Sequence, residues 1–330
     1  MAFRFKLAEP FEDGVRRIAR EQIERAQSQL KAPEDPVVAV HETRKSLKRL
    51  RALLRLIRPA LGEAAYREEN TKLREIGGGL SSTRDRHVLL ETLIKLEANS
   101  SLARKGLDQA VRNVLQLANG KDTPAVEDAA IKQAHGRLGE AKRRFAQLKL
   151  NGKGFDIVGP GLEVSYRKAR RAFHRAYAEP SDEAFHEWRK GTQQHWRHMA
   201  LLSRAWQGCL NARVAEARTL SQLLGDDHDL ALFIGFVHSE QACGLSGAQV
   251  AALEKVARQR QGELRTVAYP RGMRLFAEGA GSLRRRIAAY WEAAVALKDQ
   301  EPDEEEPKET PDKSQRPPGS RRRSAAAQPS

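Results

Sequence analysis

Apolar residues recur along most of this chain every three or four positions, and almost nowhere every second position. The first spacing is typical of amphipathic α-helices and the second of β-strands, so the pattern predicts an all-α protein. Proline and capping residues near several starts, and the glycine run at 77–79, support the ends of the expected helices. Helices are expected over residues 11–31, 36–58, 63–77, 84–98, 101–118, 124–148, 162–178, 182–206, 210–224, 228–241, 247–268 and 273–298.

Residues 300–330 differ from the rest, because they lack large apolar side chains and are rich in proline and charge. Such a segment cannot bury enough surface to offset the entropy lost on ordering. We predict a disordered, solubilising tail and a folded part that spans residues 1–299. The acidic stretch 301–306 also offers a competitor for a basic site, and Arg321–Arg323 offers weak anion contact.

Three motifs recur within the chain in the same order, at an offset close to 145 residues. Such a match is hard to obtain by chance. We therefore predict two homologous multi-helix bundles, residues 1–150 and 151–299, which pack about a pseudo-twofold axis with a ligand cleft between them. The matching segments are 40–45 with 185–190, 80–88 with 224–232 and, more loosely, 15–20 with 166–171, and Arg74 corresponds to Arg218.

The stretch from Arg44 to Arg58 carries seven lysine or arginine residues and no acid. Four of them fit an arc of roughly 80° on one side of a helix, beside a separate apolar stripe. Like charges at this spacing repel, so the basic face costs stability unless an anion meets it. The basic face consists of Arg44, Lys48, Arg51 and Arg55, and the stripe expected in the core consists of Leu47, Leu50, Leu54 and Ile57.

The second copy of this helix carries less charge. Gln193, Gln194 and Trp196 stand where the first copy has Lys48, Arg49 and Arg51. Residues 1–150 accordingly hold ten more basic than acidic residues, and residues 151–299 hold six more. The first half is expected to supply most of the attraction for an anion.

The overall charge of +15 and the pI of about 10.0 indicate an acidic partner, such as nucleic acid, polyphosphate or a membrane surface. Two cysteines are too few for a disulfide framework. The first residues have no apolar signal-peptide core, and no apolar run approaches the ~18 residues of a membrane span. We expect a cytoplasmic protein without membrane contact.

His41 and His186 begin the basic faces of the two matching helices. They are expected to donate to phosphate and to charge more readily beside an anion, so that binding tightens as the pH falls toward about 6. A structural hydrogen bond near the helix start is the alternative. Metal binding is disfavoured, because the histidines lack ligand spacing and lie among cations.

The basic residues of both copies and of the preceding helices form one candidate set for anion binding. The alternative for such charge runs is a solvated helix face. Asp85 and Asp229 are expected to be structural acids, and Trp188, Trp196, Trp206 and Trp291 are expected in the core. The candidates are His41, Arg44, Lys45, Lys48, Arg49, Arg51, Arg55, His186, Arg189, Lys190, Arg197, Arg17, Arg20, Lys168, Arg171, Arg74 and Arg218.

The pattern H-x-x-R-[KR]-x-x-[KR]-[KR]-x-R from His41 to Arg51, with its partner at His186, resembles the CHAD family over about residues 1–299. The resemblance implies an all-α fold with two helical bundles around a basic central cavity. It also implies binding of inorganic polyphosphate and association with polyphosphate granules. Many members carry a CYTH triphosphatase domain, and nothing in this sequence resembles one.

The leading hypothesis is therefore a polyphosphate-binding module that needs no cofactor and catalyses no reaction. The runner-up is a nucleic-acid-binding or nucleoid-associated protein, since a basic groove also suits DNA or RNA, although weak binding is all we expect. A third hypothesis, a metal-dependent enzyme acting on phosphoanhydrides, would need acidic ligands near the basic face. Asp226 and Asp227 form the one acidic pair available there.

Overall fold

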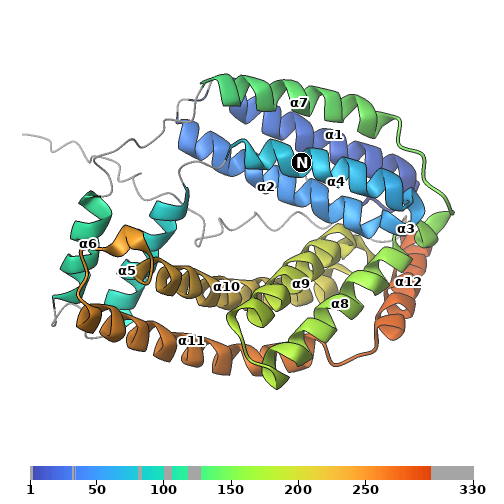
Figure 1. The fold of residues 1–330 in the computed structure, drawn as a ribbon. Coiled ribbons are helices and arrows are strands. Elements are labelled where there is room, and N and C mark those ends of the chain that lie inside the picture. Colours follow the sequence, from blue (N-terminus) through green and yellow to red (C-terminus); the bar gives the residue numbers. More distant parts are fainter. Residues whose placement is uncertain are drawn as a thin grey trace, which may run out of the picture.

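The structure, a computed structural model, describes residues 3–31, 33, 35–80, 84–99, 106–117 and 128–298. Within these residues every regular element is helical (Figure 1), so the predicted all-α class is confirmed. No helix among them is long and apolar enough to cross a membrane. The predicted tail, 300–330, and the first residues of the helices predicted at 101–118 and 124–148 lie outside the described residues.

The helices follow the predicted order along the chain, with short 3₁₀ helices at some of the connections. Their bounds are α1 (Phe11–Leu30), α2 (Pro36–Leu56), α3 (Arg58–Leu61), α4 (Glu63–Gly78), α5 (Arg84–Asn99), α6 (Leu107–Leu117), α7 (Asp128–Ala146), η3 (Gly154–Ile157), α8 (Gly159–Ala178), α9 (Asp182–Leu201), η4 (Ser203–Ala205), α10 (Gln207–Val237), η5 (Glu240–Ala242), α11 (Gly247–Leu275) and α12 (Ala280–Leu297).

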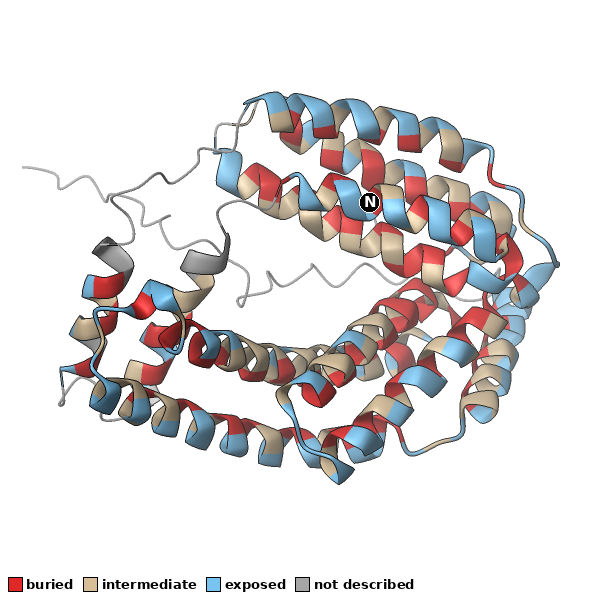
Figure 2. Cartoon of the chain, in the orientation of Figure 1, coloured by how far each residue is buried: buried red, intermediate tan, exposed pale blue. Residues whose placement is uncertain are grey.

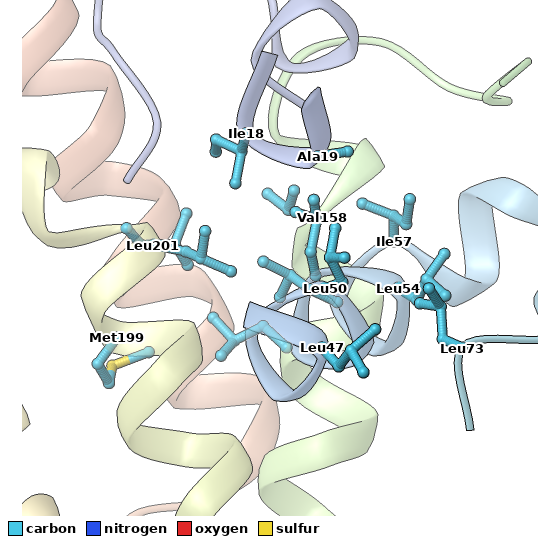
Figure 3. Close-up of a cluster of buried hydrophobic side chains, with 14 of the residues drawn as sticks. Ile18, Ala19, Leu47, Leu50, Leu54, Ile57, Leu73, Val158, Met199 and Leu201 are labelled. Atoms are coloured by element: carbon cyan, nitrogen blue, oxygen red, sulfur yellow. The ribbon is translucent and has the colours of Figure 1, made fainter. Parts of the chain in front are cut away.

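Helices α1, α2, α4 and α7 form one group, in which α1 and α4 each pack against both α2 and α7 (Figure 1). The apolar stripe of α2 is buried as predicted, with Leu50 and Leu54 fully inaccessible. Figure 3 places this stripe among side chains from α1, α4 and α9. Each such leucine contributes about 1.5–3 kcal/mol relative to an exposed one, so this face fixes how α2 is turned and leaves its charged side outward.

Helices α8, α9 and α12 and the first part of α10 form a second group, which meets the first along α2. Gly161 of α8 lies so close to α2 that a Cβ atom there would be 1.8 Å from the carbonyl oxygen of Leu56. Nearby, the Nε2 atom of the buried His198 on α9 lies 3.0 Å from the carbonyl oxygen of Ala52. These contacts join the C-terminal half of α2 directly to the second group.

Helix α10 corrects one sequence prediction, because the helices expected at 210–224 and 228–241 are a single helix, Gln207–Val237. The prediction left residues 225–227 between the two helices as a break. Instead Asp227 is buried and accepts a 2.7 Å hydrogen bond from Arg265 Nε of α11, so a tertiary ion pair overrides the weak local propensity. Helix α11 likewise runs through Pro270 and ends at Leu275, beyond the predicted end.

A second hydrophobic cluster lies where α5 packs against the far ends of α10 and α11 and where α6 packs against α5 and η5 (Figures 1 and 2). Leu93 and Val111 from the first half of the sequence meet Phe233 and Leu253 from the second half in this cluster. An ion pair of 2.6 Å between Lys95 of α5 and Asp226 of α10 lies beside it. The hydrophobic clusters therefore do not follow the sequence division at residue 150.

Candidate anion-binding site

The basic face of α2 begins with a well-formed helix start. Asp35 caps it, because its Oδ1 atom accepts hydrogen bonds from the backbone N–H groups of Val37, at 2.8 Å, and Val38, at 3.2 Å, and Pro36 occupies the first turn. The predicted basic residues from His41 to Arg55 all lie along this helix and are half-buried. Partial burial weakens solvent screening, so their charges interact more strongly than they would on an open face.

Arg51 is the centre of a cationic cluster formed by two helices. Burial, together with the charges of Arg55 and Arg74, lowers the pKa of the Arg51 guanidinium. Its Nε atom donates a 3.0 Å hydrogen bond to Asn70 Oδ1 of α4, which holds the side chain beside Arg74. The structure thus brings together three candidates that the sequence placed on two separate helices, and an anion between them would relieve their repulsion.

The cluster continues across the contact between α2 and α9. Burial lowers the pKa of His198 to about 4, and the charges of Arg55 on α2 and Arg197 on α9 add to this shift. The Trp196 ring of α9 lies beside two cations of this cluster. The Arg197 guanidinium is 4.3 Å from the ring centroid, and that of Arg218, on α10, is 4.8 Å from it. We call the five residues of this line the crossing arginines: Arg74, Arg51, Arg55, Arg197 and Arg218.

The N-terminal half of α9 holds another basic group. The His186 ring stacks on that of His228 in α10, with centroids 4.2 Å apart and planes 24° from parallel. The Arg189 guanidinium lies near Gly225 of α10, where a Cβ atom would be 3.8 Å from its Nε and Nη2 atoms. Burial and the charges of His228, Lys190 and Arg189 lower the pKa of His186 to about 4. His186 is therefore neutral near pH 6 without a ligand, and it gains charge there if an anion offsets these cations.

Two of the candidate lysines are held in ion pairs that occupy matching places in the two halves. Lys45 Nζ lies 2.7 Å from Glu42 Oε1, and Lys190 Nζ lies 2.5 Å from Glu187 Oε1. Glu42 also lies 3.8 Å from Arg25 of α1. The run without acids begins at Arg44, and the acid that pairs with Lys45 lies just before it.

Other candidates point away from the crossing arginines. Arg49 faces α1, with its Nη1 atom 3.5 Å from Gln22 Oε1. Arg17 Nε donates to Glu9 at 2.8 Å, which ties α1 to the N-terminal segment. Arg17 and Arg20 line a pocket of about 300 Å³ between α1 and α7, to which α2 contributes no lining residue. Arg17 and Arg20 follow the outward face of α1, because its apolar face is turned toward α2.

Lys168 and Arg171 lie exposed on α8. The pKa of Glu187 on α9 is lowered, mainly by its hydrogen bond with Lys190, although burial acts in the opposite direction. The charge of Lys168 also contributes to the lowering, so Lys168 lies close to α9. On α10, Asp229 Oδ1 lies 3.6 Å from His228 Nδ1, so this acid lies beside a histidine. The Asp85 side chain lies outside the described residues.

Trp196 was expected in the core, and its position beside two arginines was not predicted. Trp188 and Trp291 are buried as expected, whereas Trp206 is 54% exposed. Trp196 is partly buried at the edge of the core. In the sequence, the adjacent Arg197 and the match between Arg218 and Arg74 are the signals that could have placed Trp196 beside arginines.

Comparison with known proteins bears on the fold and the family. The model of the CHAD domain family matches residues 17–238. The solved structure of PptA from Streptomyces chartreusis is similar at a TM-score of 0.57 and 15% identity, covering 81% of this chain and 100% of that chain. The CHAD domain from the plant Ricinus communis aligns with a TM-score of 0.44 and 17% identity, covering 89% of this chain and 94% of that chain. No curated protein matches.

The family match spans about two thirds of the sequence, from α1 to the end of α10. It includes both histidine motifs and all five crossing arginines. This chain belongs to the CHAD domain family.

Proposed function

We propose that this protein binds inorganic polyphosphate along the basic face of α2 and across to α9 and α10, without catalysing a reaction. The observation that carries the proposal is the convergence of Arg51, Arg55 and Arg74, whose mutual repulsion, added to burial, lowers the pKa of Arg51. A cluster of this kind costs stability in the free protein, and an anion returns that free energy as affinity.

The chemistry of the cluster suits a flexible chain of phosphates. A guanidinium matches two phosphate oxygens with two parallel N–H donors, and it stays charged in all ordinary conditions. Basic residues three and four positions apart on α2 rise by about 5.4 Å per turn, which gives stepped contacts along an extended anion. Such contacts need no base recognition, and they favour a ligand that is uniformly charged.

We also propose that the two halves are related by a pseudo-twofold axis and that polyphosphate lies in a central cleft between them. The hydrogen bond between His198 and the Ala52 carbonyl supports this arrangement. Under the sequence repeat, position 52 corresponds to 197 and position 53 to 198. Helices related by a twofold axis cross at corresponding positions, and residues 52 and 198, which are in contact, are one position from exact correspondence.

A binding assay with competition tests the proposal. Calorimetric titration of the full chain with long-chain polyphosphate is expected to reveal binding that weakens steeply as salt rises. Polyphosphate is expected to displace duplex DNA, with affinity that increases with chain length. Equal affinity for duplex DNA at physiological salt would refute the proposal in favour of nucleic-acid binding.

The absence of catalysis is tested separately. Within the described residues, no three His, Cys, Asp or Glu side chains are grouped so that they could hold a metal ion. Incubation with polyphosphate and Mg²⁺ or Mn²⁺ is expected to release no orthophosphate. Sustained release that disappears in an Arg51→Gln variant would assign hydrolysis to this site. Granule association, which we propose as a consequence of binding, is tested by cosedimentation with isolated polyphosphate granules.

A further inference from the structure

The surroundings of Trp196 differ from those of the residue that matches it in the first half. Trp196 stands where the first half has Arg51, and Arg218 stands where it has Arg74. In the first half the two matching residues are both cations and repel each other. In the second half the Arg218 guanidinium lies 4.8 Å from the centroid of the Trp196 ring. An electrostatic repulsion is thus replaced by a cation–π attraction at matching places.

Trp196 also contacts the arginine that follows it. The Arg197 guanidinium lies 4.3 Å from the ring centroid, and its Nη1 atom donates a 2.8 Å hydrogen bond to the Gln193 carbonyl oxygen. Arg197 is 6% exposed, so its side chain has little freedom. Two arginines from different helices, α9 and α10, are therefore held against one indole ring.

We propose that Trp196 is a positioning residue for polyanion binding, which orients Arg197 and Arg218 so that the second half binds through preorganised guanidinium groups rather than through many charges. The inference rests on the proposed function, since the anion is taken to be polyphosphate. A free arginine side chain samples many rotamers, and part of that freedom is lost when a phosphate fixes it. Stacking on the indole imposes that loss before the ligand arrives.

Arg218 is only partly buried beside the ring, whereas Arg197 is nearly buried and already donates to the Gln193 carbonyl oxygen. A guanidinium that lies over an aromatic ring presents its N–H groups in its own plane, toward the edges, where a phosphate is recognised by paired hydrogen bonds. The replacement of a charge by Trp196 therefore removes one cation and fixes two others. Leucine at this position would keep the apolar packing and lose the aromatic face, whereas phenylalanine would keep both in part.

The test compares Trp196→Leu, Trp196→Phe and Arg218→Gln with the wild-type chain, by calorimetric titration with polyphosphate at several salt concentrations. Trp196→Leu is expected to weaken binding about 5- to 10-fold with little change in the salt slope, because every cation remains. Trp196→Phe is expected to stay within about 2-fold of wild type. Arg218→Gln is expected to weaken binding and also to reduce the slope of log K against log salt by nearly one unit, by analogy with nucleic acids.

A spectroscopic readout separates positioning from general packing. Polyphosphate is expected to change the tryptophan emission of the wild-type chain, and most of that change is expected to vanish in Trp196→Phe, which keeps the other three tryptophans. Thermal unfolding of each variant monitors the fold. The proposal is overturned if folded Trp196→Leu binds as tightly as wild type, or if the emission change survives in Trp196→Phe.

The same titrations with duplex DNA distinguish this inference from the proposed function. If wild type binds DNA and not polyphosphate, and Trp196→Leu weakens DNA binding, the proposed function fails and the role of Trp196 stands. If wild type binds polyphosphate and Trp196→Leu binds equally well, the role of Trp196 fails alone. If wild type binds neither anion, both are refuted.

Discussion

The basic helices α2 and α9 occupy matching places in the sequence repeat, yet they hold their charges in different ways. On α2, Arg51 is held by Asn70 and repelled by its cationic neighbours. On α9, Trp196 takes the matching position and attracts Arg197 and Arg218. The first half therefore has electrostatic free energy to gain from an anion, while the second half has already satisfied part of its charge within the protein.

One feature is common to both helices. Each places a glutamate three residues before a lysine, and the two side chains pair. This local compensation means that counting basic residues overstates the attraction of either helix. The difference in polyphosphate binding between α2 and α9 is expected to come from the crossing arginines. Those of the first half repel one another, whereas those of the second half lie against Trp196.

The largest effect is expected from a substitution that disrupts the contact between the two halves. A Cβ atom at Gly161 would lie 1.8 Å from the Leu56 carbonyl oxygen, so Gly161→Ala must push α8 away from α2. We expect a loss of at least about 3 kcal/mol in the free energy of unfolding, measured by urea denaturation. Gly262→Ala is the matched control, because its Cβ atom meets nothing within 4 Å and the change is expected to be neutral or to stabilise by up to about 1 kcal/mol. Equal denaturation midpoints for wild type and Gly161→Ala would contradict the described contact.

Acid is expected to destabilise the same contact. The pKa of His198 is about 4 in the folded protein and 6.5 in an unfolded chain, because burial disfavours its charged form. The unfolded state therefore binds more protons between these values, and stability falls as the pH drops from about 6.5 to 4, by on the order of 3 kcal/mol. Burial also lowers the pKa of His195, which adds a loss in the same direction.

Urea denaturation across this pH range measures the effect, with His198→Gln as the comparison. Carboxylates that titrate in the same range contribute equally to both proteins. The His198→Gln curve is expected to fall less steeply than the wild-type curve. Parallel curves would show that His198 does not couple protonation to the contact between α2 and α9.

Cations that repel one another are expected to contribute more to polyphosphate binding than cations held in ion pairs. Arg51→Gln is expected to weaken polyphosphate binding about tenfold, the loss of one charged hydrogen bond in a half-buried site. Lys45→Gln and Lys190→Gln are expected to weaken it about twofold or less, since each lysine is already compensated by its glutamate. Titration calorimetry at one salt concentration gives the ranking, and a loss in Lys45→Gln as large as that in Arg51→Gln would reverse it.

The smallest effect concerns the stacked histidines of the second half. The pKa of His186 is about 4 in the free protein, because of burial and of the neighbouring charges of His228, Lys190 and Arg189, opposed by Glu187. A polyanion that raises this pKa makes binding take up protons, so affinity is expected to rise a few-fold between pH 6 and 4. His186→Gln is expected to flatten that dependence in binding measured by fluorescence anisotropy. An unchanged pH profile in the variant would exclude the coupling.

Much of the fold followed from the hydrophobic pattern, since the buried stripe of α2 and the limits of α1 and α4 agree closely with the spacing of apolar residues. The continuity of α10 did not, because Gly225 and Asp227 weaken a helix locally, whereas distant partners such as Arg265 and Lys95 stabilise that segment. The packing of α5 on α10 also escaped prediction. An apolar face specifies that it must be buried and does not specify its partner.

For the site, the spacing on α2 and the repeat together pointed to Arg51, Arg55 and Arg74. Spacing alone could not assign Arg17, whose pairing with Glu9 depends on the path of the N-terminal segment. It also could not assign Trp196, since a tryptophan beside a basic residue is usually part of a core. The structure supplies what the pattern lacks, namely which charges face one another.

The most direct test of the central claim compares the salt dependence of polyphosphate binding in two matched triple variants. Arg51→Gln/Arg55→Gln/Arg74→Gln removes three cations from the first half, and Arg189→Gln/Arg197→Gln/Arg218→Gln removes three from the second. We predict that the first variant loses at least about 100-fold in affinity and nearly three units of salt slope, while the second loses about 10-fold in affinity and a smaller amount of salt slope. Equal losses in the two variants, with both folded, would contradict the claim that the α2 face dominates binding.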